Sequence, residues 1–348
     1  MLYIVFTSSI FRKSSLDELG RIAPFKIIGE FGNFLVIDSD DDALHEKSSS
    51  SLLTYCALPI LLQGSIAEKR YRESILALIR NAGLAKGQTI KLECVNLNSR
   101  TVYSAKDLEV WLGLQLEGLG YLPDLQDPDI LVYLVLLDMR CYVGYMETAK
   151  LQRPFVNPLR YYHRKRLVSR SELKLEQAFD DFKVPKGGIA IDLGAAPGGW
   201  SCYLARMGFK VIAVDSAAMD YEAIDKTGIK LKRSSGSGKI RARELEGCDI
   251  LHVKETSESA AKRIAVHGID LITDDMNTDC NGTYAAIKPY IGMLRHSAAA
   301  IITVKCISKN IPKYTRQAAA LFGKEFVVMG MRVLPSNRQE FTLFARRK

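Results

Sequence analysis

The sequence predicts an α/β protein with a C-terminal, Rossmann-like, doubly wound domain and two smaller α/β domains before it. From residue 171 onward, apolar segments typical of strands alternate with segments typical of helices, which indicates a doubly wound sheet. A glycine-rich turn follows the first of these strands, and the next strand ends in Asp215. The predicted strands lie near Ala190, Val211, Ile250, Ile269, Ala300, Phe326 and Phe341. The last two lack a clear helix between them, so an antiparallel hairpin is expected to end the sheet.

The N-terminal part divides into two short α/β segments, as a length of 348 residues allows. Residues 1–60 form the first, with strands expected near 2–6, 26–29 and 33–37 and a helix near 15–22. Residues 61–149 form the second, with helices expected near 68–82 and 105–119 and strands near 89–95, 130–137 and 140–145. Apolar residues from Ile75 to Ile79 recur at helical spacing and support the first of these helices.

Residues 150–170 form a basic connector in which aromatic residues alternate with cations. Lysine and arginine meet phosphates, and aromatic rings stack on unpaired bases, so this composition favours a path for nucleic acid. The predicted RNA-binding residues are Arg160, Arg164, Lys165, Arg166 and Arg170. The alternative is a solvated linker whose aromatic residues anchor it to a neighbouring domain.

The net charge of +9 is distributed unevenly along the chain. Residues 1–150 carry 15 Lys and Arg against 19 Asp and Glu, whereas residues 151–348 carry 33 against 20. This asymmetry indicates a polyanionic partner for the C-terminal part, although a merely solvated basic surface has the same composition. Charge alone does not distinguish RNA, DNA and an anionic membrane surface.

Composition and motifs exclude several classes of protein. Hydrophobic residues make up 47% and charged residues 25% of the chain, as in ordinary soluble proteins. No apolar run approaches the roughly 20 residues that span a bilayer, and the N-terminus has no signal-peptide pattern. The seven cysteines are scattered without a C-x-x-C pair, which predicts reduced thiols and no metal site. We therefore expect a cytoplasmic protein with no membrane partner.

The turn after the first strand of the C-terminal domain predicts a nucleoside site. Glycines let the backbone approach a ligand, and an acid about 20 residues after the first glycine binds ribose hydroxyls. Pro197 removes an amide that a pyrophosphate would need, so the expected ligand is a nucleoside without phosphates, most commonly S-adenosylmethionine. A turn that serves only strand–helix packing is the alternative. The predicted cofactor-binding residues are Asp192, Gly194, Ala196, Pro197, Gly198, Gly199, Trp200 and Asp215, with Glu255 and Asp275 from later strand ends.

Two lysines and two carboxylates are the candidates for the chemistry. Asp275 follows the fourth predicted strand and Lys305 ends the fifth. Glu340 lies near the start of the last strand, and Lys174 lies on the helix before the first. Ligands of open α/β sheets bind at the carboxyl ends of the strands, so these side chains are expected to meet there. A lysine whose neighbours adjust its pKa can withdraw the proton of a ribose hydroxyl during methylation. The second lysine lowers that pKa and the carboxylates raise it. Taken singly, Asp275 could instead cap a helix and Glu340 could pair with Arg338.

From about residue 165 to its end, the chain resembles the RrmJ/FtsJ family of S-adenosylmethionine-dependent RNA 2′-O-ribose methyltransferases. The matching segments are residues 169–176, 192–200, 275–276, 304–305 and 338–342. This resemblance implies that Lys174, Asp275, Lys305 and Glu340 are the catalytic tetrad, with Lys305 as the base. The family usually has an aspartate after the third strand that contacts adenine; here the segment contains Glu255, which is expected to replace it.

The layout of the whole chain is similar to the RlmM type within that family. The similarity implies a ferredoxin-like domain over 1–60, a THUMP-like RNA-binding domain over 61–149, a basic linker over 150–170 and a methyltransferase domain over 171–348. The stretch from Asp127 to Tyr145 resembles the end of a THUMP domain. This layout implies ribosomal RNA as the partner, and tRNA is the alternative because THUMP domains accompany many tRNA enzymes.

Three other functions compete with ribose methylation. A base methyltransferase would use a proline-rich loop after the fourth strand or a cysteine nucleophile, for which Cys280 and Cys306 lack the usual neighbours. A nicotinamide dehydrogenase would use Asp215 for its ribose, but Pro197 and the paired lysines argue against it. A non-catalytic RNA-binding protein would have no need to keep all four residues of the tetrad.

Overall fold

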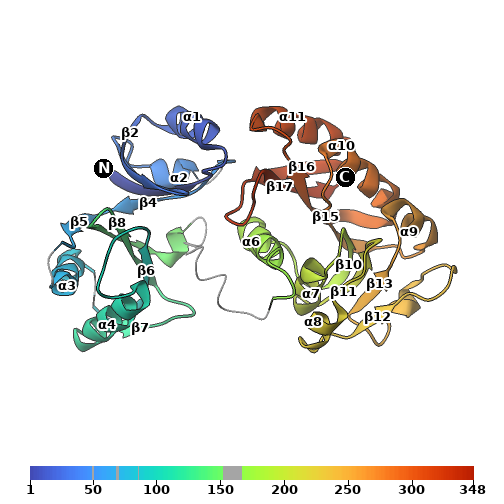
Figure 1. Ribbon diagram of the computed structural model, residues 1–348, viewed down its shortest axis with the longest axis horizontal. Helices are drawn as coiled ribbons and strands as arrows, with labels where there is room; N and C mark the ends of the chain where they lie inside the picture. Colours follow the sequence, from blue (N-terminus) through green and yellow to red (C-terminus); the bar gives the residue numbers. More distant parts are fainter. Residues whose placement is uncertain (49–50, 68–69, 85, 152–166) are drawn as a thin grey trace. The chain divides into compact units, whose positions relative to one another are not determined.

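A computed structural model describes residues 1–48, 51–67, 70–84, 86–151 and 167–348 of the chain. The chain divides into two compact units, Met1–Asn157 and Pro158–Lys348 (Figure 1). Within the described ranges, every helix is too short or too polar to cross a membrane.

The first unit begins with a four-stranded antiparallel sheet in the order β2-β3-β1-β4. Its elements are β1 (Leu2–Thr7), α1 (Arg12–Ile22), β2 (Phe25–Phe31), β3 (Phe34–Ser39), α2 (Leu44–Ser48) and β4 (Thr54–Ile60). Alternate apolar residues of β1 and β3, such as Tyr3, Val5 and Leu35, pack with Leu19 of α1 into one small core. The strand β4 was not predicted from the sequence.

The same unit contains a second sheet, with five strands in the order β5-β9-β8-β6-β7. Its elements are β5 (Leu62–Ser65), α3 (Tyr71–Asn81), β6 (Thr89–Asn96), α4 (Ala105–Gly118), β7 (Leu122–Pro123), β8 (Ile130–Leu137) and β9 (Arg140–Glu147). Ser104 begins α4 with a capping box, since its hydroxyl accepts from the Asp107 amide and the Asp107 carboxylate accepts from the Ser104 amide. Every residue of β8 is buried, and the Tyr133 hydroxyl donates to the Pro59 carbonyl of the first sheet.

The second unit is built on an eight-stranded mixed sheet in the order β12-β13-β11-β10-β14-β15-β17-β16. The strands are β10 (Gly188–Leu193), β11 (Phe209–Val214), β12 (Leu231–Arg233), β13 (Ile250–Val253), β14 (Ile269–Asp274), β15 (Leu294–Lys305), β16 (Phe326–Arg332) and β17 (Glu340–Arg347). The Rossmann-like doubly wound prediction is confirmed, including the antiparallel hairpin of β16 and β17. β12 was not predicted, because its three residues are too few to show a strand period.

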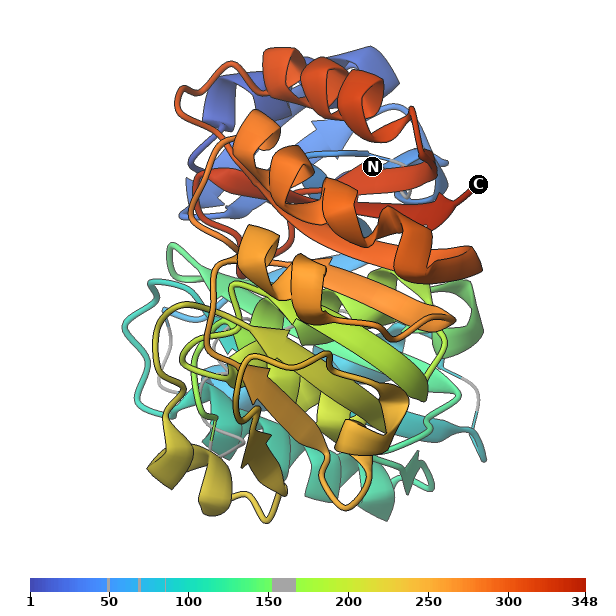
Figure 2. The same cartoon turned by 90° about the vertical axis from the view of Figure 1, so that its right-hand side faces the viewer.

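Helices cover both faces of this sheet. The helices are α6 (Glu172–Phe182), α7 (Gly199–Arg206), α8 (Tyr221–Asp225), α9 (Ser257–Arg263), α10 (Cys280–Ile287) and α11 (Ile311–Phe322). α6 packs against α7, and α10 packs against both α9 and α11. Figure 2 shows α9, α10 and α11, in orange and red, in front of the strands.

The strand order reverses beside β10, and this reversal places the candidate site. β10 continues through α7 to β11 on one side, and β14 lies on its other side. Loops that leave the carboxyl ends of β10 and β14 in opposite directions open a crevice between them. The glycine-rich turn follows β10 and Asp275 follows β14, so both line this edge.

Candidate active site

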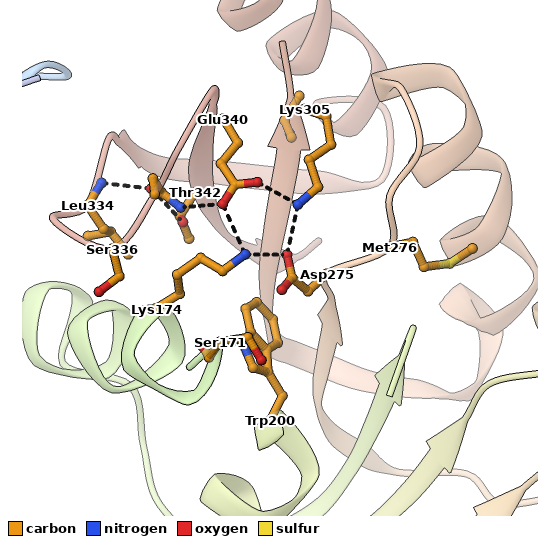
Figure 3. A network of polar contacts seen from close by, with 12 residues as sticks. Ser171, Lys174, Trp200, Asp275, Met276, Lys305, Leu334, Ser336, Glu340 and Thr342 are labelled. Carbon is orange, nitrogen blue, oxygen red and sulfur yellow. Dashed lines mark hydrogen bonds and ion pairs between the residues drawn. The ribbon is translucent and has the colours of Figure 1, made fainter. Parts of the chain in front are cut away.

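The four predicted catalytic residues meet in one closed network of ion pairs (Figure 3). The Lys174 ammonium donates to Asp275 Oδ1 at 2.7 Å and to Glu340 Oε1 at 3.0 Å. The Lys305 ammonium donates to the same Asp275 oxygen at 3.2 Å and to Glu340 Oε2 at 2.5 Å. Each carboxylate therefore bridges both lysines.

Four separate elements bring the tetrad together. Lys305 ends β15 and Glu340 begins β17, and the antiparallel register places the two directly opposite each other. Asp275 follows β14, where its amide donates to the Leu193 carbonyl at the end of β10. Lys174 reaches the group from the first turn of α6. Cross-strand pairing thus fixes one half of the network and helix packing fixes the other.

Mutual ion pairing keeps the network charged. Burial alone would lower the pKa of Lys305, but Asp275 and Glu340 outweigh it and hold that pKa above its ordinary value. Burial alone would raise the pKa of Glu340, but the two lysines outweigh it and hold that pKa below its ordinary value. In the free protein the carboxylates therefore prevail over burial, so the raised pKa keeps Lys305 an ammonium at neutral pH.

The alternative roles of the individual residues do not hold. The side chain that caps α10 belongs to Asp279, which accepts from the Gly282 amide, and not to Asp275. Glu340 pairs with the two lysines, whereas its ion pairs among the described residues do not include Arg338.

Neighbouring side chains orient the tetrad. The Trp200 indole donates to the Ser171 carbonyl at 2.8 Å, and its ring centre lies 5.9 Å from the Lys174 nitrogen. Asn337 is nearly buried, and its amide nitrogen lies 3.4 Å from Glu340 Oε1 while its oxygen accepts from the Leu334 amide. Asn337 was not predicted from the sequence, because its role depends on a loop conformation that no motif encodes.

A cavity of about 410 Å³ opens beside Asp275 at the carboxyl ends of the strands. Its lining residues are Gly194, Ala196, Val214, Asp215, Ser216, Glu255, Thr256, Ser257, Asp275, Met276 and Asn277. These lining residues include three carboxylates and no lysine or arginine, and we call this space the acidic cavity. Such a lining favours a cationic ligand over a polyphosphate.

The predicted cofactor residues divide into two groups. Gly194, Ala196, Asp215, Glu255 and Asp275 line the acidic cavity. The other five do not: Asp192, Pro197, Gly198, Gly199 and Trp200 support the turn and the helix after it. Several lining residues were missed, including Ser216, Thr256, Met276 and Asn277. They lie two or three residues after the ends of β11, β13 and β14, so the argument from strand ends that identified Asp275 applies to them as well.

Besides Asp275, the acidic cavity is lined by two acids, Asp215 and Glu255, and different partners hold their carboxylates. Asp215 accepts from the Ala196 amide at 2.9 Å and from the Ala217 amide at 2.8 Å, so the glycine-rich turn fixes its carboxylate. Glu255 pairs with Arg263 and accepts from the Ser259 hydroxyl at 2.6 Å. The partners of Glu255 neutralise part of its charge, whereas the hydrogen bonds to the Asp215 carboxylate from the described residues come from neutral amides.

Two glycines are required by close contacts in this turn. Gly194 has φ +70°, and a Cβ there would lie 2.8 Å from the Met276 side chain. A Cβ on Gly199 would lie 2.1 Å from Ser169 Oγ and 3.1 Å from Ser171 Oγ. The turn after β10 therefore touches both the loop after β14 and the start of α6.

A second cavity of about 340 Å³ lies on the lysine side of the tetrad. Its lining residues are Arg170, Ser171, Lys174, Lys305, Ser336, Arg338 and Glu340. Four of these seven are cationic, and we call this space the basic cavity. Because Lys174 and Lys305 bond to Asp275 of the acidic cavity, the tetrad joins the walls of both cavities. Of the predicted RNA-binding residues, Arg170 lines the basic cavity, while Arg160, Arg164, Lys165 and Arg166 lie outside the described residues.

Two further carboxyl groups are buried at the ends of β10 and β14. Asp192 accepts from the Ser201 and Thr273 hydroxyls at 2.6 and 2.8 Å, and burial raises its pKa to about 7. Burial raises the pKa of Asp274 to about 8, and one of its oxygens has no hydrogen-bond partner among the described residues. No group of three or more potential metal ligands occurs in the described part of the chain.

Comparison with known proteins agrees with this geometry. The FtsJ-like methyltransferase family model matches residues 167–314, which include Lys174, Asp275 and Lys305. Two relatives are named ribosomal RNA large subunit methyltransferase M. The one from Shewanella sp. (strain W3-18-1) is 39% identical over 106 residues, which cover 28% of this chain and 29% of the relative. The one from Shewanella baltica (strain OS155) is 38% identical over the same lengths.

The similarity to these relatives is local, because the matched stretch spans less than a third of their length. Among solved structures, TrmN from Thermus thermophilus is 14% identical with 100% of both chains covered, but the TM-score of 0.36 is too low to support an argument. The family model includes three of the four tetrad residues, and Glu340 lies beyond its end. Residues 167–314 thus match the FtsJ-like methyltransferase family.

Proposed function

We propose that this chain transfers a methyl group from S-adenosylmethionine to the 2′-hydroxyl of a ribose in RNA. The observation that carries the proposal is the position of the tetrad between two cavities of opposite charge. An acidic cavity suits a cationic donor and a basic cavity suits a polyanionic acceptor, so the side chains between them lie where donor and acceptor meet.

The residues of the acidic cavity suit S-adenosylmethionine. Asp215 presents a fixed carboxylate to ribose hydroxyls, and Gly194 leaves room for the ligand beside the turn. Asp275 and Glu255 add two carboxylates whose charge is partly neutralised by ion pairs, and the partner cations do not line the cavity. When bound there, S-adenosylmethionine supplies a methyl group on a positively charged sulfur. Glu255 remains our candidate for the adenine contact.

Lys305 is our candidate for the base. It must lose its proton before it can accept one from the ribose hydroxyl, and its pKa is raised in the free protein. A cationic ligand beside Asp275 opposes that carboxylate's effect and lowers the pKa of Lys305. Lys174 and Glu340 then orient the amine, so its lone pair takes the hydroxyl proton as the oxygen becomes a nucleophile.

Ribosomal RNA is our candidate substrate, because the relatives are named ribosomal RNA methyltransferases. The target nucleotide is expected to be unstacked, since a ribose inside a duplex is hard to align with the partly buried amine of Lys305. The ferredoxin-like and THUMP-like domains proposed for the N-terminal unit would select the RNA. This substrate implies a cytoplasmic location, and tRNA is the alternative.

The test is methyl transfer from radiolabelled S-adenosylmethionine to total RNA, separated into ribosomal and transfer fractions and digested to nucleosides. We expect the label in a 2′-O-methylnucleoside of the ribosomal fraction. Label in the transfer fraction would change the substrate, and label on a base would overturn the proposed chemistry.

The donor has a separate test in thermal unfolding. S-adenosylmethionine is expected to raise the melting temperature, whereas NAD is not, because the acidic cavity repels its pyrophosphate. Equal stabilisation by both ligands would contradict the donor assignment.

A further inference from the structure

The basic cavity contains two kinds of cation. Lys174 and Lys305 are each paired with both tetrad carboxylates. Arg170 and Arg338 are exposed, and neither guanidinium has an ion-pair or hydrogen-bond partner among the described residues. The two lysines are therefore already ion-paired within the tetrad, whereas the two arginines can form ion pairs with a bound anion.

The two arginines come from different segments. Arg170 lies just before α6, where its carbonyl accepts from the Leu173 amide. Arg338 lies in the loop between β16 and β17, two residues before Glu340. Both line the basic cavity together with Lys305. A ligand in the cavity can thus meet a guanidinium from each segment.

Hydrogen bonds hold the loop that carries Arg338 to α6 on one side and to the residue after β15 on the other. The Ser336 amide donates to the buried Gln177 side chain of α6 at 2.9 Å. The Gln339 side chain donates to the Cys306 carbonyl after β15 at 2.7 Å, and the Cys306 amide donates back to the Gln339 carbonyl at 2.9 Å. Because the backbone is fixed, little ordering is needed to place Arg338 on a ligand.

The chemistry of the lining selects a sugar–phosphate backbone. Guanidinium groups bind phosphate in a bidentate manner, and the serine hydroxyls of the cavity are donors to phosphate or sugar oxygens. Every internal ribose of an RNA strand has a phosphate on its 5′ side and another on its 3′ side. No aromatic, asparagine or glutamine side chain is among the described residues of this lining. Its arginines and serines can also contact bases, but here phosphate and sugar oxygens would engage them.

We propose that Arg170 and Arg338 bind the two phosphates that flank the target ribose, and that the basic cavity recognises an internal nucleotide by its backbone, with little regard to the base. This inference rests on the proposed function, because it takes the ribose at Lys305 as the methyl acceptor. Selection of a particular nucleotide is then the task of other parts of the protein.

The test is the affinity of the full-length protein for fluorescent 12-nucleotide oligo(A) and oligo(U), measured by anisotropy over a range of salt concentrations. Arg170→Ala and Arg338→Ala are each expected to weaken binding about tenfold and to reduce the salt slope by about 0.7, the contribution of one phosphate contact on a single strand. Arg338→Lys keeps the charge but loses the bidentate geometry, so an intermediate affinity is expected. The two oligonucleotides should bind within about threefold of each other.

The matched control is Arg316→Ala on α11, which removes an exposed arginine outside the lining of both cavities. Affinities of Arg170→Ala and Arg338→Ala that match this control would overturn the proposal. A preference above tenfold between the two oligonucleotides would overturn recognition by backbone. S-adenosylmethionine binding, measured by calorimetry, should be unchanged in all variants and shows that they fold.

The methyl-transfer assay separates the two proposals. If the unaltered protein forms 2′-O-methylnucleosides while the arginine variants bind RNA like the control, only the phosphate assignment fails. If the arginine variants lose affinity while the label appears on a base, the phosphate assignment stands and the ribose chemistry fails.

Discussion

Lys305 is the residue on which the proposed chemistry depends most directly. Lys305→Ala removes the amine and leaves the acidic cavity lined by the same residues. Methyl transfer is expected to fall at least about 100-fold, as is usual when a general base is lost, while the affinity for S-adenosylmethionine changes little. The control is Lys309→Ala, an exposed lysine four residues away. Full activity in Lys305→Ala would exclude its role.

Substitution of Asp215 should weaken the binding of S-adenosylmethionine and leave the chemical step of methyl transfer unaffected. Its carboxylate lines the acidic cavity and is fixed by the Ala196 amide. Asp215→Ala removes the acceptor for ribose hydroxyls, so we expect S-adenosylmethionine affinity to fall about tenfold or more, measured by calorimetry. Asp225→Ala, an exposed acid on α8, is the control for charge alone. An unchanged dissociation constant for Asp215→Ala would remove its ribose role.

Asp274 should make stability depend on pH. Its pKa of about 8 lies well above the value of about 4 in an unfolded chain, so between these pH values the folded state binds a proton that the unfolded state lacks. The free energy of unfolding therefore falls as pH rises through this range, by up to about 1.4 kcal/mol per pH unit. Asp274→Asn removes this contribution and keeps an acceptor for the Met276 amide.

We expect the Asn variant to be the more stable form at pH 8 and to show a shallower pH profile in urea unfolding. Asp192 contributes to the same slope, because its pKa is raised to about 7, so part of the dependence persists. Parallel profiles for the two proteins would show that Asp274 ionises normally.

At the residue scale, the sequence predicted the tetrad but not its surroundings. Lys305 and Asp275 were predictable because each follows a recognisable buried strand. Asn337 and Ser336 were not, because their contacts with Glu340 and Gln177 depend on the path of one loop. Residues at strand ends follow from the strand pattern, whereas residues in irregular loops require coordinates.

At the element scale, the glycine-rich turn packs closely against the start of α6. The close approach of Gly199 to Ser169 means that a methyl group at position 199 would displace the start of α6 and with it Lys174. Gly199→Ala is therefore expected to destabilise the protein by about 1–3 kcal/mol and to reduce the rate of methyl transfer.

The second variant in this test is Gly199→Ala combined with Ser169→Ala, which removes the oxygen that the new methyl group meets. We expect it to recover much of the lost stability and rate. Gly292→Ala is the control, because a Cβ there has no neighbour within 4 Å. Failure of the double variant to recover would mean that the loss arises elsewhere in the turn.

The elements that the sequence did not predict are mostly short. β12 has 3 residues and β7 has 2, so neither shows a full strand repeat. β12 adds an edge to the eight-stranded sheet by pairing in parallel with β13. Long, apolar strands such as β8 and β15 were predicted because burial on the sheet gives them a continuous apolar pattern.

At the scale of the whole molecule, the cationic excess of residues 151–348 should govern RNA binding. Replacing Arg164, Lys165 and Arg166 of the connector with glutamine removes three charges. We expect weaker RNA binding and a salt slope that is smaller by up to about 2, since each lost phosphate contact contributes less than 1. An unchanged slope would indicate that the connector only links the two units.

The tetrad also constrains how such a protein can change over generations. Its two ammonium groups and two carboxylates cancel, and Lys174 and Glu340 are each about one-tenth exposed. Loss of a single member leaves an uncompensated charge in a poorly hydrated place, at a cost of about 3–5 kcal/mol. A lineage that abandons the chemistry therefore has no gradual route through this site. Descendants should keep all four residues or replace several of them together.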